Sequence, residues 1–244
     1  MQLLKGFFGM IWKFYFLLVV AISLLILYPF YFVLLQNERY FKKGFQLIRV
    51  QTKFILFMVG IRVHVEGSIP DDENTSYIIC PNHSSYLDIL ILYYSLPNYF
   101  IFLGKQELGK VPIFNIFFKK MNLLVNRTNA KAAHDAIKKA CERIEKGDNI
   151  VIFPEGTIPN SVPTMKAFKN GAFKVAKELG ISIVPVSFKD NYKILEDSMK
   201  ISANCCFGKA RVYIHPPISA AEHSKMDLVA LREKTKIIIA SKLD

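Results

Sequence analysis

The chain has few charged residues and few cysteines for its length. Of 244 residues, only 21% are charged and 52% are hydrophobic, so the sequence is more apolar than an ordinary soluble domain and a membrane contact is expected. The four cysteines show no C-x-x-C pair and no regular spacing, which argues against a disulfide framework and a zinc site and fits a reducing cytosolic environment. The sequence also lacks repeats and low-complexity linkers. A chain of this length buries enough surface for one substantial α/β domain, which excludes disorder.

The net charge of +12 is concentrated near the beginning of the chain. The first 64 residues contain eight basic residues and one acidic residue, and the first 60 hold 15 of the 32 aromatic residues. Anionic lipid explains this mixture better than nucleic acid, because nucleic-acid binders place basic and stacking aromatic residues on a polar groove. We therefore expect membrane phospholipids as partners and no nucleic acid.

An uncharged segment lies between Lys13 and Glu38. As one helix, residues 14–35 would be ~33 Å long, which is enough to cross the hydrocarbon layer. Alternatively, Pro29 kinks the segment, which then forms a hairpin in one leaflet with the basic amphipathic stretch 41–59. The basic residues after the segment favour a cytoplasmic location for the rest of the chain. A cleaved signal peptide is disfavoured, because the apolar stretch is long and no small-residue cleavage site follows it.

The pattern changes after residue 60, so we predict an N-terminal membrane helix or helical hairpin over residues 1–60 and a separate domain over residues 61–244. Short apolar runs predict strands, and helical periodicity predicts helices between them. Because strands alternate with helices, we expect an α/β fold: a single layered domain with a mixed, largely parallel sheet flanked by helices. The predicted strands are 62–66, 77–80, 99–103, 123–125, 149–153, 183–188 and 210–214, and the clearest helices are 130–146, 168–179 and 225–242.

His83 and Asp88 follow the second predicted strand. On a continuous helix they would lie ~140° apart and could not pair. If His83 lies in a loop and a helix begins near Ser84 or Ser85, Asp88 can hold one ring nitrogen while the other takes a proton from a hydroxyl. Ser85 and Asp88 also fit a capping box with a purely structural role. A hydrolase with Ser84 or Ser85 as nucleophile is a further alternative, disfavoured because neither lies in a Gly-x-Ser-x-Gly elbow.

Other short motifs follow predicted strands in a fixed order. The fifth strand runs into Pro154-Glu155-Gly156-Thr157, where a glycine permits close backbone approach and amides of a turn or helix start can face an anion. Gly104-Lys105 and Arg127 precede this motif, and the apolar run 183–188 follows it.

In this order, the motifs resemble the 1-acylglycerol-3-phosphate acyltransferases of the glycerolipid acyltransferase family. The resemblance covers about residues 60–215: His83 to Asp88 match the His-x4-Asp block, Arg127 the second block, residues 153–157 the Phe-Pro-Glu-Gly-Thr block and residues 183–188 the fourth. A membrane helix pair before the catalytic domain is also usual in this family. The resemblance implies an O-acyltransferase that moves a fatty acyl group from acyl carrier protein (acyl-ACP) or coenzyme A (acyl-CoA) to the 2-hydroxyl of 1-acylglycerol 3-phosphate, giving phosphatidic acid in phospholipid biosynthesis.

The resemblance also implies roles for individual residues. His83 would be the general base and Asp88 its orienting partner. The acceptor phosphate would contact Lys105 and Arg127, and the acceptor pocket would be shaped by Glu155, Gly156 and Thr157. No metal, cofactor or covalent intermediate is implied. The expected location is the cell membrane, with the catalytic domain 61–244 on the cytoplasmic face.

One position departs from the family pattern. The third block often continues with arginine, whereas Ile158 follows Thr157 here. Lys166 or Lys169 would then supply the positive charge, as a point charge without the arginine fork. Alternatively, the acceptor is a different lyso-lipid.

Overall fold

The computed structural model describes residues 2–70, 75–126, 130–196 and 205–243. It contains one seven-stranded sheet with the order β1-β7-β6-β2-β5-β3-β4. Adjacent strands are parallel except for the pair β6 and β7, which is antiparallel. The predicted mixed, largely parallel sheet is therefore confirmed. The strands are β1 (Ile61–Glu66), β2 (Ile78–Pro81), β3 (Phe100–Lys105), β4 (Leu123–Val125), β5 (Asn149–Val151), β6 (Ile183–Phe188) and β7 (Gly208–Ile214).

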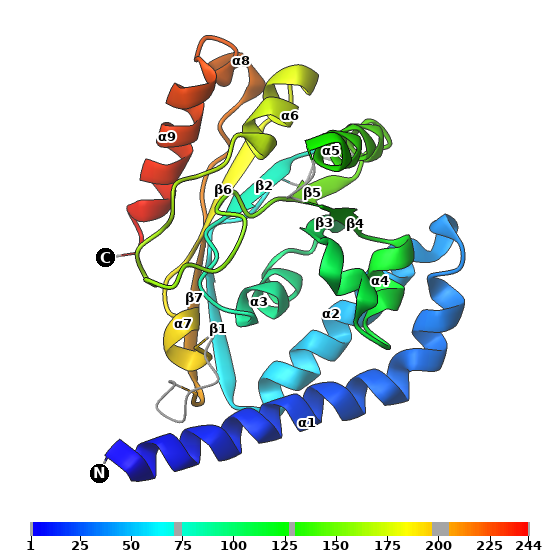
Figure 1. Ribbon diagram of the computed structural model, residues 1–244, viewed down its shortest axis with the longest axis vertical. Coiled ribbons are helices and arrows are strands. Elements are labelled where there is room, and N and C mark those ends of the chain that lie inside the picture. Colours follow the sequence, from blue (N-terminus) through cyan, green and yellow to red (C-terminus); the bar gives the residue numbers. More distant parts are fainter. Residues whose placement is uncertain (1, 71–74, 127–129, 197–204, 244) are drawn as a thin grey trace.

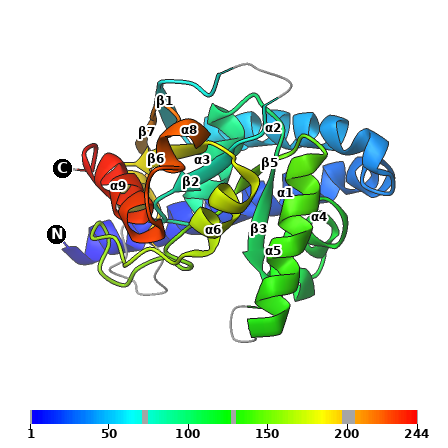
Figure 2. The ribbon, with the colours of Figure 1, turned by 90° about the horizontal axis from the view of Figure 1, so that it is seen from above.

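Helices cover both faces of this sheet (Figures 1 and 2). One face carries α5 (Ala130–Glu145), α6 (Gly171–Leu179) and α9 (Leu228–Ala240), with the short α8 (Ala220–His223) beside α6. The other face carries α2 (Phe41–Met58) and α3 (Leu87–Ser95). The remaining short helices are η2 (Gln106–Lys110), α4 (Asn115–Lys120) and α7 (Asn191–Ile194).

The middle of the sheet forms the core. Every residue of β2 and β6 is buried, as expected for strands with helices on both faces. Local signals fix the ends of the flanking helices: α6 stops at Gly180, whose φ of +63° is left-handed, and the Asp227 side chain caps α9 by accepting from the Ala230 amide.

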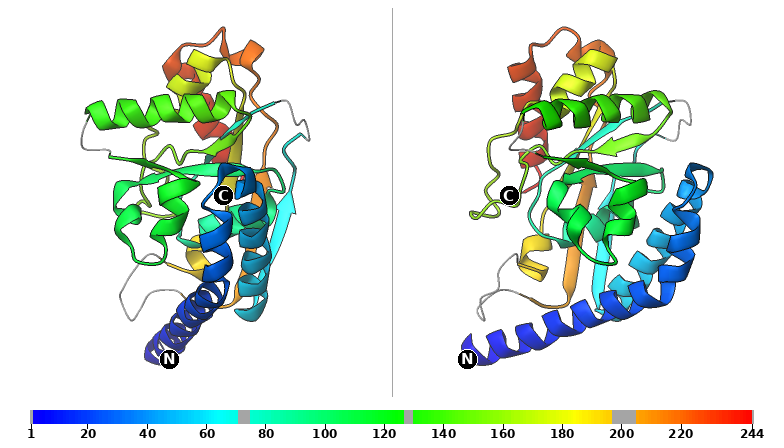
Figure 3. Two further views of the ribbon diagram at one scale, coloured as in Figure 1. Left: turned by 90° about the vertical axis from the view of Figure 1, so that its right-hand side faces the viewer. Right: turned by 45° about the vertical axis from the view of Figure 1, so that its right-hand side comes forward.

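The first helix, α1 (Gln2–Leu34), is continuous through Pro29. It bends in its second half (Figures 1 and 3), as a proline inside a helix causes. After η1 (Glu38–Tyr40), α2 returns along α1. A buried polar chain joins the two helices: the Tyr31 hydroxyl donates to Gln51 (2.6 Å), and the Gln51 amide donates to Ser23 (3.0 Å). The first 60 residues thus form a helical pair that is packed against the domain.

The outer surface of this pair is apolar. Over residues 6–34, α1 is long and apolar enough to cross a membrane, yet its N-terminal half is also tied to α2 by a hydrogen bond from Trp12 Nε1 to the Val59 carbonyl. An exposed apolar surface of this extent is typical of a membrane-associated helix. The large exposed hydrophobic side chains of α1 are Phe7, Phe8, Met10, Ile11, Phe14, Leu17, Leu18, Ile22, Leu25, Ile26, Phe30, Phe32 and Val33.

Candidate active site

The candidate site lies where parallel strands end. Strand β2 pairs with β5 on one side and with β6 on the other, in parallel, so the carboxyl ends of the three strands are adjacent. His83 follows β2, Glu155 follows β5 and Asn191 follows β6. In open α/β sheets this edge is the usual place for a ligand.

His83 and Asp88 are in direct contact. His83 lies in the loop before α3, Asp88 lies in the first turn of that helix, and Nδ1 of His83 is 2.9 Å from Oδ2 of Asp88. The same oxygen accepts from the backbone amides of Ser84 (2.7 Å) and Ser85 (3.0 Å). Asp88 therefore fixes the loop before the helix and orients the imidazole at once. Because an ionised carboxylate can only accept hydrogen bonds, Nδ1 of His83 carries the hydrogen and Nε2 keeps its lone pair.

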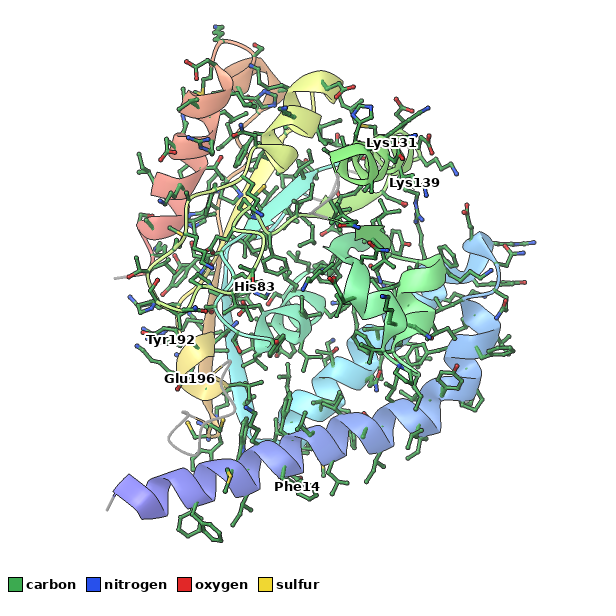
Figure 4. The ribbon with its side chains drawn as sticks, in the orientation of Figure 1. Phe14, His83, Lys131, Lys139, Tyr192 and Glu196 are labelled. Atoms are coloured by element: carbon green, nitrogen blue, oxygen red, sulfur yellow. The ribbon has the colours of Figure 1, made fainter. Side chains whose placement is uncertain are left out.

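The imidazole of His83 is held on one face by an aromatic ring. It stacks on Phe153 with 4.0 Å between ring centroids and 27° between planes, and the backbone amide of His83 donates to Glu155 Oε1 (2.8 Å). The side chain is 15% exposed, so it is supported by its surroundings and still reaches solvent. Figure 4 labels His83 where the chain leaves β2.

Asn191 also takes part in the site, and the sequence analysis did not identify it. From the start of α7, shortly after β6, its Nδ2 donates to Oδ1 of Asp88 (2.7 Å). Both Asn191 and Asp88 are fully buried, and Oδ1 of Asn191 has no hydrogen-bond partner among the described residues. The position directly after a strand end was the available signal, but the partner lies 103 residues away in the chain.

Glu155 joins two loops at the site. Its second oxygen accepts from the backbone amide of Lys166 (2.8 Å), while the first accepts from His83. Burial raises the pKa of the Glu155 carboxyl, and these two hydrogen bonds partly oppose the rise. Glu155 is thus placed to fix the loop that carries Lys166 beside the imidazole.

Lys169 lies over Gly156. Its amide donates to the Pro154 carbonyl (2.8 Å), and a Cβ added at Gly156 would lie 3.1 Å from both Cε and Nζ of Lys169. Gly156 has a φ of +78°, which favours glycine. The ammonium of Lys169 therefore lies close to the backbone at Gly156, where no side chain stands in the way.

The other predicted residues are more dispersed. Lys105 lies at the end of β3, is 62% exposed and is 3.6 Å from Glu107. Thr157 is exposed and Ile158 is buried, while Arg127 lies outside the described residues. Among the described residues, no three His, Cys, Asp or Glu side chains lie close enough together to hold a metal ion.

The geometry does not support a serine nucleophile. Ser84 and Ser85 are buried, and the Ser85 hydroxyl donates to the Leu195 carbonyl (2.6 Å) while accepting from the Leu87 amide (3.0 Å). The Ser84 hydroxyl points to Asp88 at 3.4 Å rather than to the imidazole of His83.

Comparison with known proteins gives a consistent result. The Acyltransferase family model matches residues 60–189. A 1-acyl-sn-glycerol-3-phosphate acyltransferase of Borreliella burgdorferi is 30% identical over 202 residues, which cover 82% of this chain and 79% of that protein. The chloroplastic 1-acyl-sn-glycerol-3-phosphate acyltransferase LPAT1 of Arabidopsis thaliana is 31% identical over 179 residues, 72% of this chain and 48% of that longer protein.

A solved structure shares the whole fold. The crystal structure of the 1-acyl-sn-glycerophosphate acyltransferase PlsC from Thermotoga maritima superposes with a TM-score of 0.79 at 22% identity, covering 98% of this chain and 96% of that chain. The match includes the N-terminal helices as well as the layered sheet. The resemblance seen in the motifs is confirmed: the chain belongs to the acyltransferase family, as an O-acyltransferase.

Proposed function

We propose that this protein transfers a fatty acyl group from a thioester, acyl-ACP or acyl-CoA, to the 2-hydroxyl of 1-acylglycerol 3-phosphate and so forms phosphatidic acid. The observation that carries the proposal is the 2.9 Å contact between His83 and Asp88, which leaves Nε2 of His83 as a base. The names of the Borreliella and Arabidopsis relatives support this acceptor. The basic surplus of the chain suits an acidic acyl carrier protein as donor.

In this mechanism, Nε2 of His83 takes the proton of the acceptor hydroxyl as its oxygen attacks the thioester carbonyl. The C–O bond forms, the tetrahedral intermediate collapses, and the C–S bond breaks. The departing thiolate then takes the proton from the imidazolium. Asp88 stabilises this imidazolium through Nδ1 and fixes the ring orientation, and no covalent acyl-enzyme forms.

A labelled acyl thioester tests this reaction with and without 1-acylglycerol 3-phosphate. We expect labelled phosphatidic acid only when the acceptor is present, with acyl-ACP and acyl-CoA compared as donors. Release of free fatty acid at the same rate without acceptor would instead indicate a hydrolase. A panel of lyso-lipids with other headgroups tests the alternative acceptors that Ile158 leaves open.

Lys169 is proposed to contact the acceptor phosphate in place of the missing arginine, because its ammonium lies beside Gly156. For Lys169→Ala, we expect KM for 1-acylglycerol 3-phosphate to rise about tenfold, since a charge-assisted hydrogen bond is lost. The KM for the acyl donor should stay unchanged. Steady-state kinetics with each substrate varied in turn measures both values.

The matched control for this variant is Lys174→Ala, which removes an exposed lysine from α6. Lys169→Arg should retain most of the acceptor affinity. An unchanged acceptor KM in Lys169→Ala would remove Lys169 from the proposed phosphate site.

We also propose that α1 attaches the protein to the cell membrane, with the sheet domain on the cytoplasmic side. In Phe14→Asp/Ile26→Asp, two exposed apolar side chains of α1 become charged. We expect most of the protein to leave the membrane fraction, because a charge in an apolar layer costs roughly 2.5–3.5 kcal/mol at the centre of the layer. Sedimentation of cell membranes measures this.

The control is Val229→Asp/Ile237→Asp, which changes two exposed apolar residues of α9. These point variants are preferable to deletion of residues 1–35, because Tyr31 and Leu35 are fully buried against the domain. Equal sedimentation of both double variants would contradict attachment through α1.

A further inference from the structure

A pocket lies between α7 and β7, apart from the candidate active site. Its volume is about 290 Å³, and it shares no lining residue with the candidate active site. Lys193 lines it from α7, Lys209 and Arg211 line it from β7, and Asp190 and Phe207 complete the rim. Neither the family resemblance nor the proposed reaction uses this pocket.

The pocket carries excess positive charge. Asp190 is the one acidic residue among the described residues that line it, against three basic residues. Arg211 donates to both carboxylate oxygens of Asp190, and Lys193 adds a contact at 3.3 Å. Burial alone would raise the pKa of Asp190, but these hydrogen bonds outweigh burial and hold it below its usual range. The carboxylate stays charged and is fully engaged, so two positive charges remain unbalanced.

The neighbouring strand adds a further cation at this edge. Arg62 of β1 is in register with Lys209 of β7, and both side chains are exposed. Like charges in adjacent strands repel each other. An anion that binds beside Lys209 relieves this repulsion.

The pocket opens beside the membrane-associated helix. Phe207 is 72% exposed, and its Cβ lies 3.2 Å from the position of a Cβ added at Gly60. Gly60 directly follows the carbonyls of Met58 and Val59, which accept hydrogen bonds from α1. α7, which contains Tyr192 (labelled in Figure 4), lies at the end of the sheet that faces the N-terminal half of α1 (Figures 1 and 3).

An exposed aromatic residue beside exposed and half-buried cations is the chemistry of the headgroup region of a bilayer. We propose that this pocket binds the phosphate of an anionic phospholipid of the membrane to which α1 attaches. The phosphate meets Lys193 and Lys209, while Phe207 enters the acyl boundary. This lipid is a second ligand rather than the acyl acceptor, and the proposal rests on membrane attachment but not on the proposed reaction.

Cys206 provides a reporter inside the pocket. It lines the pocket, and it is the exposed one of the four cysteines, whereas Cys80 and Cys205 are buried and Cys141 on α5 is intermediate. The full chain is bound to vesicles of phosphatidylcholine alone or mixed with phosphatidylglycerol. Mass spectrometry then measures alkylation of Cys206 by a charged maleimide, with Cys141 as the internal reference.

We expect mixed vesicles to slow alkylation of Cys206 about fivefold or more relative to phosphatidylcholine vesicles at equal bound protein, since each basic residue near the surface attracts anionic lipid. Lys193→Gln/Lys209→Gln should abolish this difference. The control Lys131→Gln/Lys139→Gln removes the same charge from α5, far from the N-terminal half of α1 (Figure 4), and should retain the difference.

Three alkylation results would overturn the proposal. These are equal alkylation rates on both kinds of vesicle, protection that persists in Lys193→Gln/Lys209→Gln, and equal protection by inorganic phosphate without vesicles, which would indicate a small-anion site. Failure of the chain to bind either kind of vesicle would overturn it as well. The alkylation readout does not depend on turnover. A protein without the proposed acyltransferase activity can therefore still show the lipid site, and an active protein can still lack it.

Discussion

His83→Ala is expected to lower kcat by about 10³-fold while the protein stays folded, because general base catalysis contributes roughly 10²–10⁴-fold. The imidazole is the base in the proposed mechanism, and its Nε2 has the lone pair because Nδ1 is bonded to Asp88. Turnover of labelled acyl thioester with saturating acceptor gives kcat. The acceptor KM should change little, since the phosphate contact is made elsewhere.

Two further variants make this test specific. His83→Gln keeps a polar side chain of similar reach without a base, and it should be as inactive as His83→Ala. His134→Ala removes an exposed histidine of α5 and should keep full activity. Near-normal turnover in a folded His83→Ala variant would remove the base from the mechanism.

The sheet could be predicted well from the sequence because each strand is a short apolar run between turn residues. All seven predicted strands are present, with ends that differ by at most two residues; β7, for example, begins at Gly208 rather than at residue 210. The helix ends were less accurate where long-range contacts decide them. The helix predicted from residue 168 begins at Gly171, because Lys169 instead donates its amide to Pro154.

The site could be predicted only where it is local in sequence. His83 and Asp88 are five residues apart, so the motif showed that they could pair, and Glu155 and Gly156 lie in one motif after β5. Asn191 could not be found in this way. Its contact with Asp88 depends on β6 lying next to β2, and strand order is a property of the folded sheet rather than of local pattern.

The position of Lys169 could also be predicted only in part from the sequence. Ile158 in place of the family arginine left three alternatives open: Lys166, Lys169 or a different lyso-lipid acceptor. The proposal of Lys169 depends on the fold of the loop, where Glu155 binds the backbone of Lys166 while the side chain of Lys169 lies over Gly156.

Asp88→Asn separates the negative charge of the carboxylate from the hydrogen bonds that it accepts. Ser84 and Ser85 both donate backbone amides to Oδ2, so the oxygen of an asparagine amide must occupy that position and still accepts from Nδ1 of His83. The amino group of the new asparagine then faces Asn191. Because Oδ1 of Asn191 has no partner among the described residues, Asn191 can turn its amide so that this oxygen accepts from the new amino group. The variant should therefore fold with the imidazole in its native tautomer and lack only the negative charge.

We expect Asp88→Asn to lower kcat about 10²-fold, because the imidazolium that forms during the reaction is no longer stabilised by a carboxylate. Asn122→Ala is the matched control for loss of a buried polar contact: its side chain bonds to the backbone of Phe102 and Phe117, so stability should fall while kcat of the folded protein stays near normal. A folded Asp88→Asn variant with near-normal kcat would show that the negative charge of Asp88 does not contribute to catalysis.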